Sequence, residues 1–220
     1  MKKIVKNEYK KWLLATFCVF IPIVAIYMQE TSTKHIIPKA IKVEALKALS
    51  YYPELKHTAI EFKFKNDIKK SIMQAQPTFW SLLKAKKNRS YKIFISESFQ
   101  IEGRQFSTAD IPKNVLIGWL GHELGHVMDY RDRSSLNLIW FGIKYTFSDS
   151  YIKEAERAAD TYAVEKNMDG YILETKNFIL NHTDLSEAYK DRIKKYYLSP
   201  DEIVKLVEDR DLDAALESEH

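Results

Sequence analysis

The sequence predicts an α+β domain, in which a small, mainly antiparallel sheet is combined with long helices. Residues 58–65 alternate apolar and charged side chains, and residues 91–96 form a second short apolar run, as strands with a buried face do. Residues 115–130 and 151–167 instead repeat apolar or small residues at helical spacing. We expect the first of these helices to cross behind the sheet and the second to pack alongside it.

The beginning of the chain predicts a membrane anchor. A cluster of lysines precedes residues 12–28, which carry no charge and are close to the lower limit of the roughly 17 to 25 residues that cross a bilayer as a helix. Trp12 and Tyr27, near the ends of this run, fit an aromatic belt, and the lysines predict a cytoplasmic amino terminus. The following domain would then lie on the outer side, periplasmic or extracellular. The expected divisions are a basic segment (1–11), a transmembrane signal anchor (12–28), a polar linker (29–37) and one domain (38–220).

Other interpretations of the apolar run fit less well. No small-x-small site follows it at residues 27–30, which argues against a cleaved signal peptide. Bulky Phe17 precedes Cys18, where lipoprotein processing would require a small residue. The remaining alternative is a buried helix of a soluble domain, although so long an uncharged run seldom suits a small core.

Length and composition limit the class of protein. The 220 residues, 45% of them hydrophobic and 29% charged, provide one domain with a real core. The net charge of +4 is spread over many lysines without an aromatic-interleaved basic motif, so no nucleic-acid partner is predicted. Cys18 is the only cysteine, which excludes an intrachain disulfide and a cysteine metal ligand.

Three elements are expected before the residues that carry the chemistry. Pro38 begins a helical pattern that extends to about Tyr52 and should cover the sheet. Residues 71–76 are short, polar and stopped by Pro77, features that suit an edge strand. The next helix begins near residues 110–112, where proline is tolerated in a first turn.

His122, Glu123 and His126 form an H-E-x-x-H motif inside this helix. Histidines four residues apart lie one turn above each other, so their imidazoles can converge on one cation. Glu123 lies about 100° round the helix from His122, beside the same point. Zinc suits imidazole and carboxylate ligands, and three protein ligands leave a position for a water whose pKa falls to about 7. A carboxylate can take the proton of that water, so the motif predicts a metal-assisted hydrolase with Glu123 as general base. A chance match is the alternative.

A stripe of glycines accompanies the motif. Gly118, Gly121 and Gly125 share a face of the helix, and each costs about 1 kcal/mol relative to alanine. Three such residues need a reason, which the close approach of another backbone supplies. The expected partner is the helix at residues 151–167.

The partner helix offers a small-residue face with two carboxylates. Ala159 and Ala163 share this face with Glu156 and Asp160. Docking against the glycines would bring Glu156 near enough to be the third metal ligand, while Asp160 would hydrogen-bond a ligand imidazole and fix its tautomer. Glu154 competes for the ligand role, but it points about 200° away from Glu156 and has no carboxylate one turn later.

The two motifs resemble those of the gluzincin metallopeptidases, which combine H-E-x-x-H with a downstream E-x-x-x-D helix. The matching segments are residues 122–126 and 156–160. The E-x-x-A-D form and the small size look like the membrane-associated family that includes the CAAX prenyl proteases and bacterial heat-shock membrane peptidases, or a minimal relative. The resemblance covers about residues 111–167 and, more weakly, extends to residue 198. Metzincins are a poorer match, because their last histidine ligand is replaced here by Asp132.

The resemblance implies a zincin-like fold, a zinc ion and a peptide or protein substrate, with Glu156 as ligand and Asp160 as orienter. Peptidases of this type hold extended substrates by strand addition, so residues 71–76 are a candidate peptide cradle. An ordinary edge strand is the alternative. The same family carries a histidine followed by a helix with an Arg-Ile pair, which His182 and Arg192 with Ile193 resemble.

Several later residues have less certain roles. Residues 136–147 are unusually apolar and could be a membrane-dipping element, a substrate lid or part of the core, of which the core is favoured. Tyr145 or Tyr151 could help an oxyanion, although each would serve equally as a packed aromatic. Candidate oxyanion donors beyond the ligand helix are His182, Tyr189 and Arg192, with a helix cap and surface charges as the alternative. Residues 199–202 read as a capping box that starts a last helix.

We therefore predict a zinc-dependent metalloendopeptidase that is tethered to a membrane by its amino-terminal helix. The alternative is a membrane-anchored binding or scaffold protein with a structural or vestigial zinc site. The presence of Glu123 argues against that alternative, because a purely structural site has no use for a base beside an open ligand position.

Overall fold

The computed structural model describes residues 35–66, 68, 71–101, 104–108, 111–181 and 185–218. These residues belong to one compact unit, Lys34–His220. The basic segment and the membrane anchor predicted for residues 1–28 lie outside the described residues. Within the described ranges, none of the helices combines the length and the apolar character needed to cross a bilayer.

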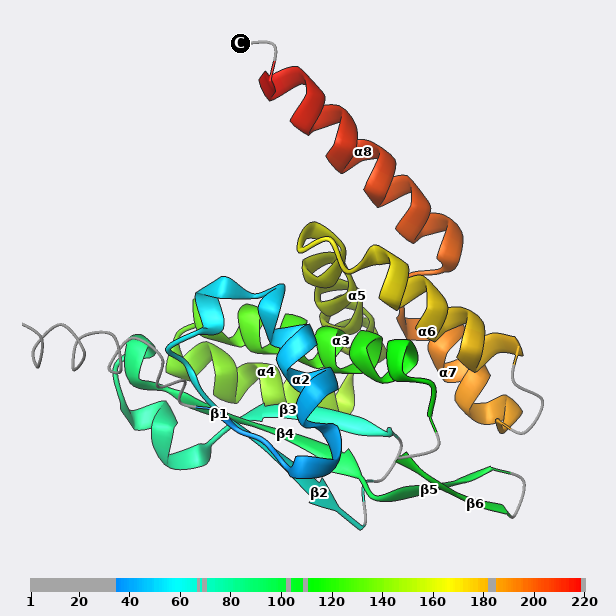
Figure 1. The fold of residues 1–220 in the computed structure, drawn as a ribbon. Coiled ribbons are helices and arrows are strands. Elements are labelled where there is room, and N and C mark those ends of the chain that lie inside the picture. Colours follow the sequence, from blue (N-terminus) through cyan, green and yellow to red (C-terminus); the bar gives the residue numbers. More distant parts are fainter. Residues whose placement is uncertain are drawn as a thin grey trace, which may run out of the picture. The chain divides into compact units, whose positions relative to one another are not determined.

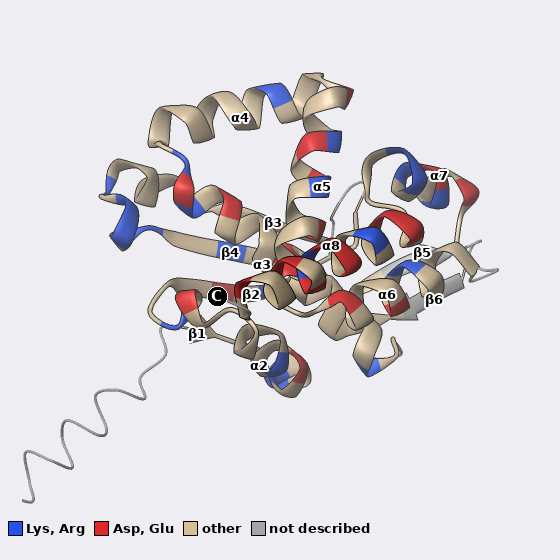
Figure 2. Cartoon of the chain, turned by 90° about the horizontal axis from the view of Figure 1, so that it is seen from above, with Lys and Arg blue, Asp and Glu red and all other residues tan. Residues whose placement is uncertain are grey.

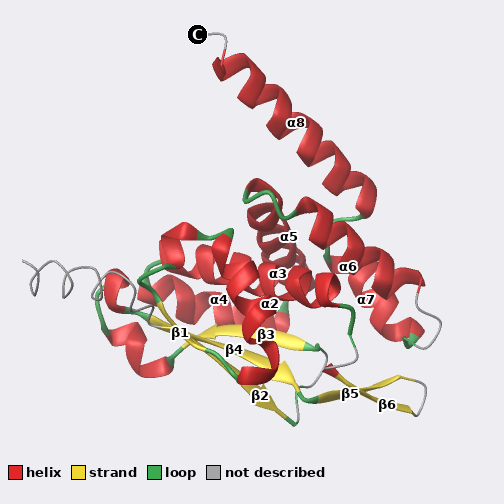
Figure 3. Ribbon diagram, in the orientation of Figure 1, coloured by secondary structure: helices red, strands yellow, loops and turns green. Residues whose placement is uncertain are grey.

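A four-stranded sheet forms one layer of this unit (Figures 1 and 3). Its strands, in spatial order, are β1 (His35–Ile36), β2 (Ala59–Lys65), β4 (Ser90–Ser96) and β3 (Met73–Pro77). β1 and β4 run parallel to β2, and only β3 is antiparallel to its neighbour. β3 lies at an edge, as predicted for residues 71–76. A separate antiparallel hairpin consists of β5 (Ser98–Ile101) and β6 (Arg104–Ser107).

The α+β class is confirmed, but the expectation of a mainly antiparallel sheet is wrong. Alternation of apolar and polar residues shows that a strand has one buried face, and it carries no information about strand direction. The connections set the direction. Helix α2 (Lys42–Ser50) lies between β1 and β2 and returns the chain to the same end of the sheet, as a parallel pair requires. Residues 35–36, which form β1, fall inside the predicted linker and are too few to show alternation.

One face of the sheet is buried, and the other is exposed to solvent. Phe62 of β2 and Ala75 of β3 both lie opposite Ile93 of the central strand β4, and all three are buried. On the other face, Lys92 forms an ion pair with Glu61 at 3.0 Å, and both side chains are about one third exposed. The buried face can therefore hold helices in fixed positions.

Helices α2 and α3 (Lys113–Asp132) cover the buried face (Figure 1). A 3-10 turn, η1 (Lys39–Ile41), precedes α2, so the two together account for the helix predicted over residues 38–52. Tyr52, just after α2, donates a hydrogen bond from its hydroxyl to the backbone carbonyl of Gly121 at 2.7 Å. This buried contact fixes the middle of α3 against α2.

The other α-helices of the described residues follow in the second half of the chain and are labelled in Figure 3. They are α4 (Ser135–Phe147), α5 (Asp149–Glu165), α6 (Asp169–Asn181), α7 (Glu187–Tyr196) and α8 (Pro200–Ser218), with the short 3-10 helices η2 (Pro53–Leu55), η3 (Phe79–Leu83) and η4 (Lys86–Asn88) in the first half. The predicted capping box opens α8. The backbone N–H of Ser199 donates to Glu202 at 2.9 Å, and the backbone N–H of Glu202 donates to the Ser199 hydroxyl at 3.2 Å.

The glycine stripe of α3 serves two partners instead of the single one expected. A Cβ at Gly125 would overlap the backbone carbonyl of Ala159 in α5, which is the predicted contact. A Cβ at Gly118 would overlap the carbonyl of Tyr171 in α6, and one at Gly121 would meet Met168 just before α6. The positions of the glycines around a helix can indicate close approach, but they cannot tell how many helices share the contact.

Only one face of helix α4 belongs to the core, whereas the favoured interpretation assigned residues 136–147 to it. Leu138 and Phe141 are buried, but most of its large apolar side chains are exposed, with Phe147 at 85%. The reason is geometric: α4 rests on its neighbours by one face only, and its apolar residues are distributed around more than that face.

Candidate metal centre

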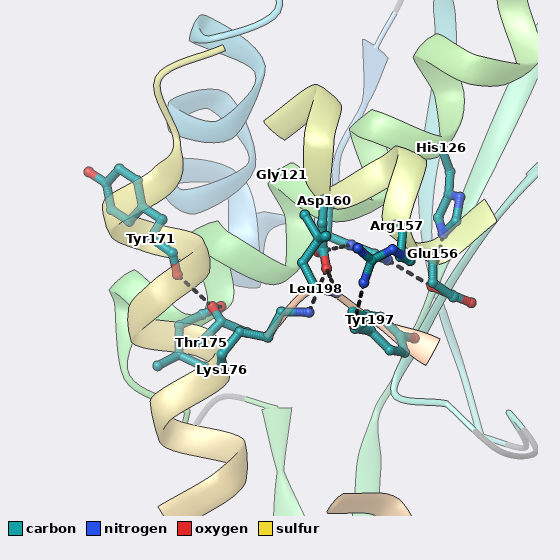
Figure 4. A network of polar contacts seen from close by, with 12 residues as sticks. Gly121, His126, Glu156, Arg157, Asp160, Tyr171, Thr175, Lys176, Tyr197 and Leu198 are labelled. Atoms are coloured by element: carbon teal, nitrogen blue, oxygen red, sulfur yellow. Dashed lines mark hydrogen bonds and ion pairs between the residues drawn. The ribbon is translucent and has the colours of Figure 1, made fainter. Parts of the chain in front are cut away.

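Three buried side chains from two helices meet at one point. His122 and His126 extend from α3, and Glu156 extends from α5. The Nε2 atoms of the two histidines lie 3.1 and 3.3 Å from the same Glu156 oxygen, Oε2. Figure 4 shows His126 and Glu156 pointing toward each other across the two helices. One ligand atom from each of the three residues can be chosen so that all lie within 4.8 Å of one another.

The convergence follows from local sequence. The four-residue spacing places both imidazoles on one side of α3. Gly125 on that helix lets the backbone of α5 come close at Ala159, three residues after Glu156. With a side chain at position 125, the helices would separate and Glu156 would move away from the imidazoles. The structure thus brings together the three residues that were predicted as metal ligands.

Asp160 is completely buried and contacts the ring nitrogen of His122 that faces away from Glu156. Its Oδ1 lies 2.8 Å from Nδ1 of His122, while Oδ2 accepts hydrogen bonds from Lys176 Nζ at 2.8 Å and from the Leu198 backbone N–H at 3.1 Å (Figure 4). Burial raises the pKa of Asp160, but the charges of Lys176 and His122 outweigh it and lower the pKa. The carboxylate is therefore ionised and accepts, so Nδ1 of His122 carries the hydrogen and Nε2 faces the cluster.

The ligand group carries strong electrostatic coupling. Burial lowers the pKa of His122, yet the carboxylates of Asp160 and Glu156 more than offset it and raise the pKa to about 10. Burial likewise raises the pKa of Glu156, but hydrogen bonds from both histidines hold it well below its ordinary value. Both pKa shifts arise from attraction between the imidazoles and the carboxylates, so the buried carboxylates favour positive charge beside them.

Glu123 lies on the other side of the histidines, against the edge strand. Its Oε2 accepts a hydrogen bond from the backbone N–H of Ala75 in β3 at 2.6 Å, and burial raises the pKa of its carboxyl group. The backbone N–H of Ser96 donates a hydrogen bond to the carbonyl of Ile72, and the backbone N–H of Thr78 donates one to the carbonyl of Ser90. The even-numbered residues of the β3 segment therefore form its backbone hydrogen bonds with β4. The odd-numbered residues, including Ala75, therefore direct their backbone groups to the free edge.

Some of the residues predicted as possible oxyanion donors lie at the cluster, and others do not. Tyr145 of α4 donates a hydrogen bond to Oε1 of Glu156, and Arg192 of α7 lies 3.9 Å from the same oxygen. Tyr189 lines the cavity beside Glu123. Tyr151, in contrast, accepts from Lys144 at 2.5 Å at the surface and does not join the cluster.

Two sequence candidates play no described part in the cluster. His182 lies outside the described residues. Glu154 is exposed on α5, as expected from its angle to Glu156. Sequence reasoning also missed two contributors, namely Lys176, whose side chain reaches Asp160, and Tyr197, whose ring lies 5.2 Å from that of His122. The helical spacing of Lys176 from the apolar Ile172 and Ile179 is the one signal that could have pointed to the first.

A small cavity of about 30 Å³ adjoins His122 and Glu123. It lies between the β3 segment, α3, α6 and α7. Its lining combines apolar residues, among them Ile72, Trp119 and Ile193, with polar ones that include Thr175, Lys176 and Tyr189. The cavity has room for a small group only.

Comparison of the chain with models of known protein families, with curated proteins and with solved structures gives no match. The function is therefore argued from the site alone.

Proposed function

We propose that this protein is a zinc-dependent metalloendopeptidase, tethered to a membrane by residues 12–28. The observation that carries the proposal is the convergence of His122, His126 and Glu156 on one point, with Glu123 on the same helix beside the free edge of a strand. A base next to an open ligand position, and an edge beside that base, are what peptide hydrolysis requires.

The residues present fit a zinc ion. Two imidazole nitrogens and one carboxylate oxygen form the donor set of many catalytic zinc sites, and three ligands leave one position open. The hydrogen bond between Asp160 and Nδ1 of His122 leaves Nε2 of His122 for the metal. Nδ1 of His126 is buried and bonds to no other described residue, so its Nε2 is the atom aimed at the cluster. When bound, zinc would supply a water of lowered pKa and polarise the scissile carbonyl.

Glu123 is the proposed general base. Burial raises the pKa of its carboxyl group, which brings its basicity closer to what proton transfer near neutral pH needs. It would take a proton from the attacking water and later deliver that proton to the leaving amine. The Ala75 N–H holds the carboxylate in place at 2.6 Å before the reaction.

The free edge of β3 is the proposed substrate-binding edge. Backbone groups of odd-numbered residues there can pair with an extended peptide, and the bond between Ala75 and Glu123 sets that peptide beside the base. The adjoining small cavity would then receive a small side chain next to the scissile bond. Substrates with a bulky residue at that position should be poor.

Tyr145 and Arg192 are proposed as positioning residues. Tyr145 donates a hydrogen bond to Oε1 of Glu156, and Arg192 forms an ion pair with the same oxygen. Oε2 is then left for the two histidines and the metal. Either could also donate to an oxyanion once a substrate is present. Tyr189, which lines the cavity, is the third candidate for that role.

A scaffold protein with a structural metal site is the second candidate. The observation in its favour is that Glu123 is buried and already bonded to the Ala75 N–H, as a purely structural carboxylate would be. In that case Glu123 joins α3 to β3 and performs no chemistry.

The experiment is metal analysis together with digestion of a peptide library by the full-length chain in detergent. We expect about one zinc per chain and cleavage that chelators abolish and zinc restores. Zinc binding without cleavage of any library member would favour the scaffold, and the absence of metal binding would reject both candidates.

A further inference from the structure

Helix α4 has two apolar faces with different surroundings. The inner face, made of Leu138, Phe141 and Tyr145, points toward the metal centre, since Phe141 packs on Tyr130 and Tyr145 donates to Glu156. The outer face is exposed. Its large apolar residues are Leu136, Ile139, Trp140, Ile143 and Phe147, of which Trp140 is 62% and Phe147 85% exposed. An exposed apolar surface of this size normally marks an interaction site.

A second exposed apolar group adjoins the first turn of α4. Phe79, Trp80 and Leu83 of η3 are all at least 70% exposed. The Ser135 hydroxyl, at the start of α4, donates to the backbone carbonyl of Leu82 at 2.6 Å, so η3 and α4 touch. We call the exposed apolar residues of η3 and the outer face of α4 together the aromatic surface.

The two segments that carry the aromatic surface contain charges of a single sign, while the exposed Asp132 and Asp149 lie just outside the ends of α4. Residues 79–88 and 135–147 contain four lysines and no aspartate or glutamate; the lysines are Lys84, Lys86, Lys87 and Lys144, and all four are exposed. Figure 2 shows α4 almost entirely tan, with a single blue segment. In a chain that has 30 acidic residues, their absence from both segments favours an anionic partner.

The strand pairing places the start of the described chain at the end of the sheet from which η3 emerges, although β1 and β3 lie at opposite edges. His35 begins β1 opposite Ile60, which is itself opposite Tyr91 at the start of β4. β3 is antiparallel, so its last residue, Pro77, also lies opposite Tyr91, and η3 follows directly. The chain therefore reaches β1 at the end of the sheet from which η3 emerges.

From these observations we propose that the aromatic surface is a membrane-contact surface that lies in the interface of an anionic lipid bilayer. Tryptophan and phenylalanine with flanking lysines are the composition of interfacial segments, because the rings bury in the headgroup region while the lysine amines stay in water. A second copy of the chain is a poorer occupant, since the centres of protein interfaces are depleted in lysine. The proposal does not depend on the peptidase activity. It places the metal centre about one helix diameter, roughly 10 Å, from the lipid.

Quenching of a fluorescent label by brominated lipids tests the proposal. The full-length chain with Cys18→Ser and Trp140→Cys is labelled at position 140 and mixed with vesicles of phosphatidylcholine and phosphatidylglycerol that contain brominated lipid. We expect a blue shift and loss of fluorescence at position 140. The matched control, Leu212→Cys, is also exposed but lies on α8, which projects away from α4 in Figure 1, and its fluorescence should stay unchanged.

Charge variants sharpen the test. Lys84→Gln together with Lys87→Gln should reduce quenching at position 140 in phosphatidylglycerol vesicles and leave it unchanged in pure phosphatidylcholine. The proposal is overturned if the chain sediments with the vesicles while the label at position 140 shows neither a blue shift nor quenching. It is also overturned if the chain does not bind the vesicles. A blue shift that needs no lipid and grows with protein concentration also overturns it, because a second copy then covers the surface.

Discussion

Helices α4 and α5 directly follow α3 in the chain. Each contradicts the simple rule that apolar residues are buried and charged residues are exposed. α4 contains one charged residue, Lys144, yet exposes most of its large apolar side chains. α5 is rich in charge and yet buries two carboxylates, Glu156 and Asp160. Burial is decided here by what each helix meets: α5 lies close against α3 at Gly125, whereas α4 touches its neighbours along one face.

The comparison also shows what a buried carboxylate needs. Asp160 has three hydrogen-bond donors around it, and Glu156 has two imidazoles and a tyrosine hydroxyl. Without such partners the burial of an ionised group costs several kcal/mol. The exposed apolar side chains of α4 carry no comparable penalty in water, so a folded domain can keep them for a contact made elsewhere.

The largest difference is expected from Glu156→Ala, because it removes a proposed metal ligand. The variant should lose zinc, and with it the stabilisation that zinc gives, about 4 kcal/mol when free zinc is a thousandfold above its Kd. Glu154→Ala, two residues earlier on the exposed side of α5, is the matched control and should bind zinc like the parent chain. Metal analysis and thermal unfolding with and without zinc give the result. If Glu154→Ala loses the metal and Glu156→Ala keeps it, the ligand assignment is wrong.

Substitution of two neighbouring aromatic residues of α4 should change the free energy of unfolding by different amounts on its two faces. Phe141 is buried against Tyr130 and under the Arg133 guanidinium, so Phe141→Ala should cost about 3–5 kcal/mol of unfolding free energy. Trp140→Ser, on the outer face, should change it by no more than about 0.5 kcal/mol in lipid-free detergent solution. Denaturant unfolding measures both. Equal losses at the two positions would mean that the outer face is covered within the protein.

The buried partner of His122 should tune metal affinity without setting the ligand geometry. Asp160→Asn keeps the size of the side chain but removes its charge, and it should weaken zinc binding about 10- to 100-fold. Lys176→Met should act in the same direction by a smaller amount, because it frees Asp160 without removing it. Competition with a zinc-binding dye measures the Kd. Unchanged affinity in Asp160→Asn would show that the contact with His122 has no part in metal binding.

Two glycines provide the smallest and most specific contrast. Gly125→Ala places a Cβ against the Ala159 carbonyl and should destabilise the fold by about 1–3 kcal/mol, with weaker zinc binding as the helices separate. Gly142→Ala on α4 has no heavy atom within 4 Å of the new Cβ and should stabilise the helix by about 0.5–1 kcal/mol. Opposite signs support the packing argument; a loss at both positions would mean that α4 is also closely packed.

Sequence reasoning worked where the information is local. The spacing of His122, Glu123 and His126, and of Glu156 and Asp160, fixes which side chains share a helix face, and the structure brings those faces together. It failed where the information is carried by other parts of the chain. Strand direction depends on the connections, the exposure of α4 depends on what its neighbours leave uncovered, and Lys176 and Ala75 approach the site from distant elements.

The most direct test of the central claim compares Glu123→Gln with the parent chain, both loaded with one zinc. The substitution keeps the size of the side chain and can still pair with the β3 edge, but it removes the base. We predict that the variant retains zinc and stability and cleaves the best library peptide roughly 10²- to 10⁴-fold more slowly. Cleavage at the parental rate by Glu123→Gln would contradict the claim that this cluster is a hydrolytic centre with Glu123 as its base.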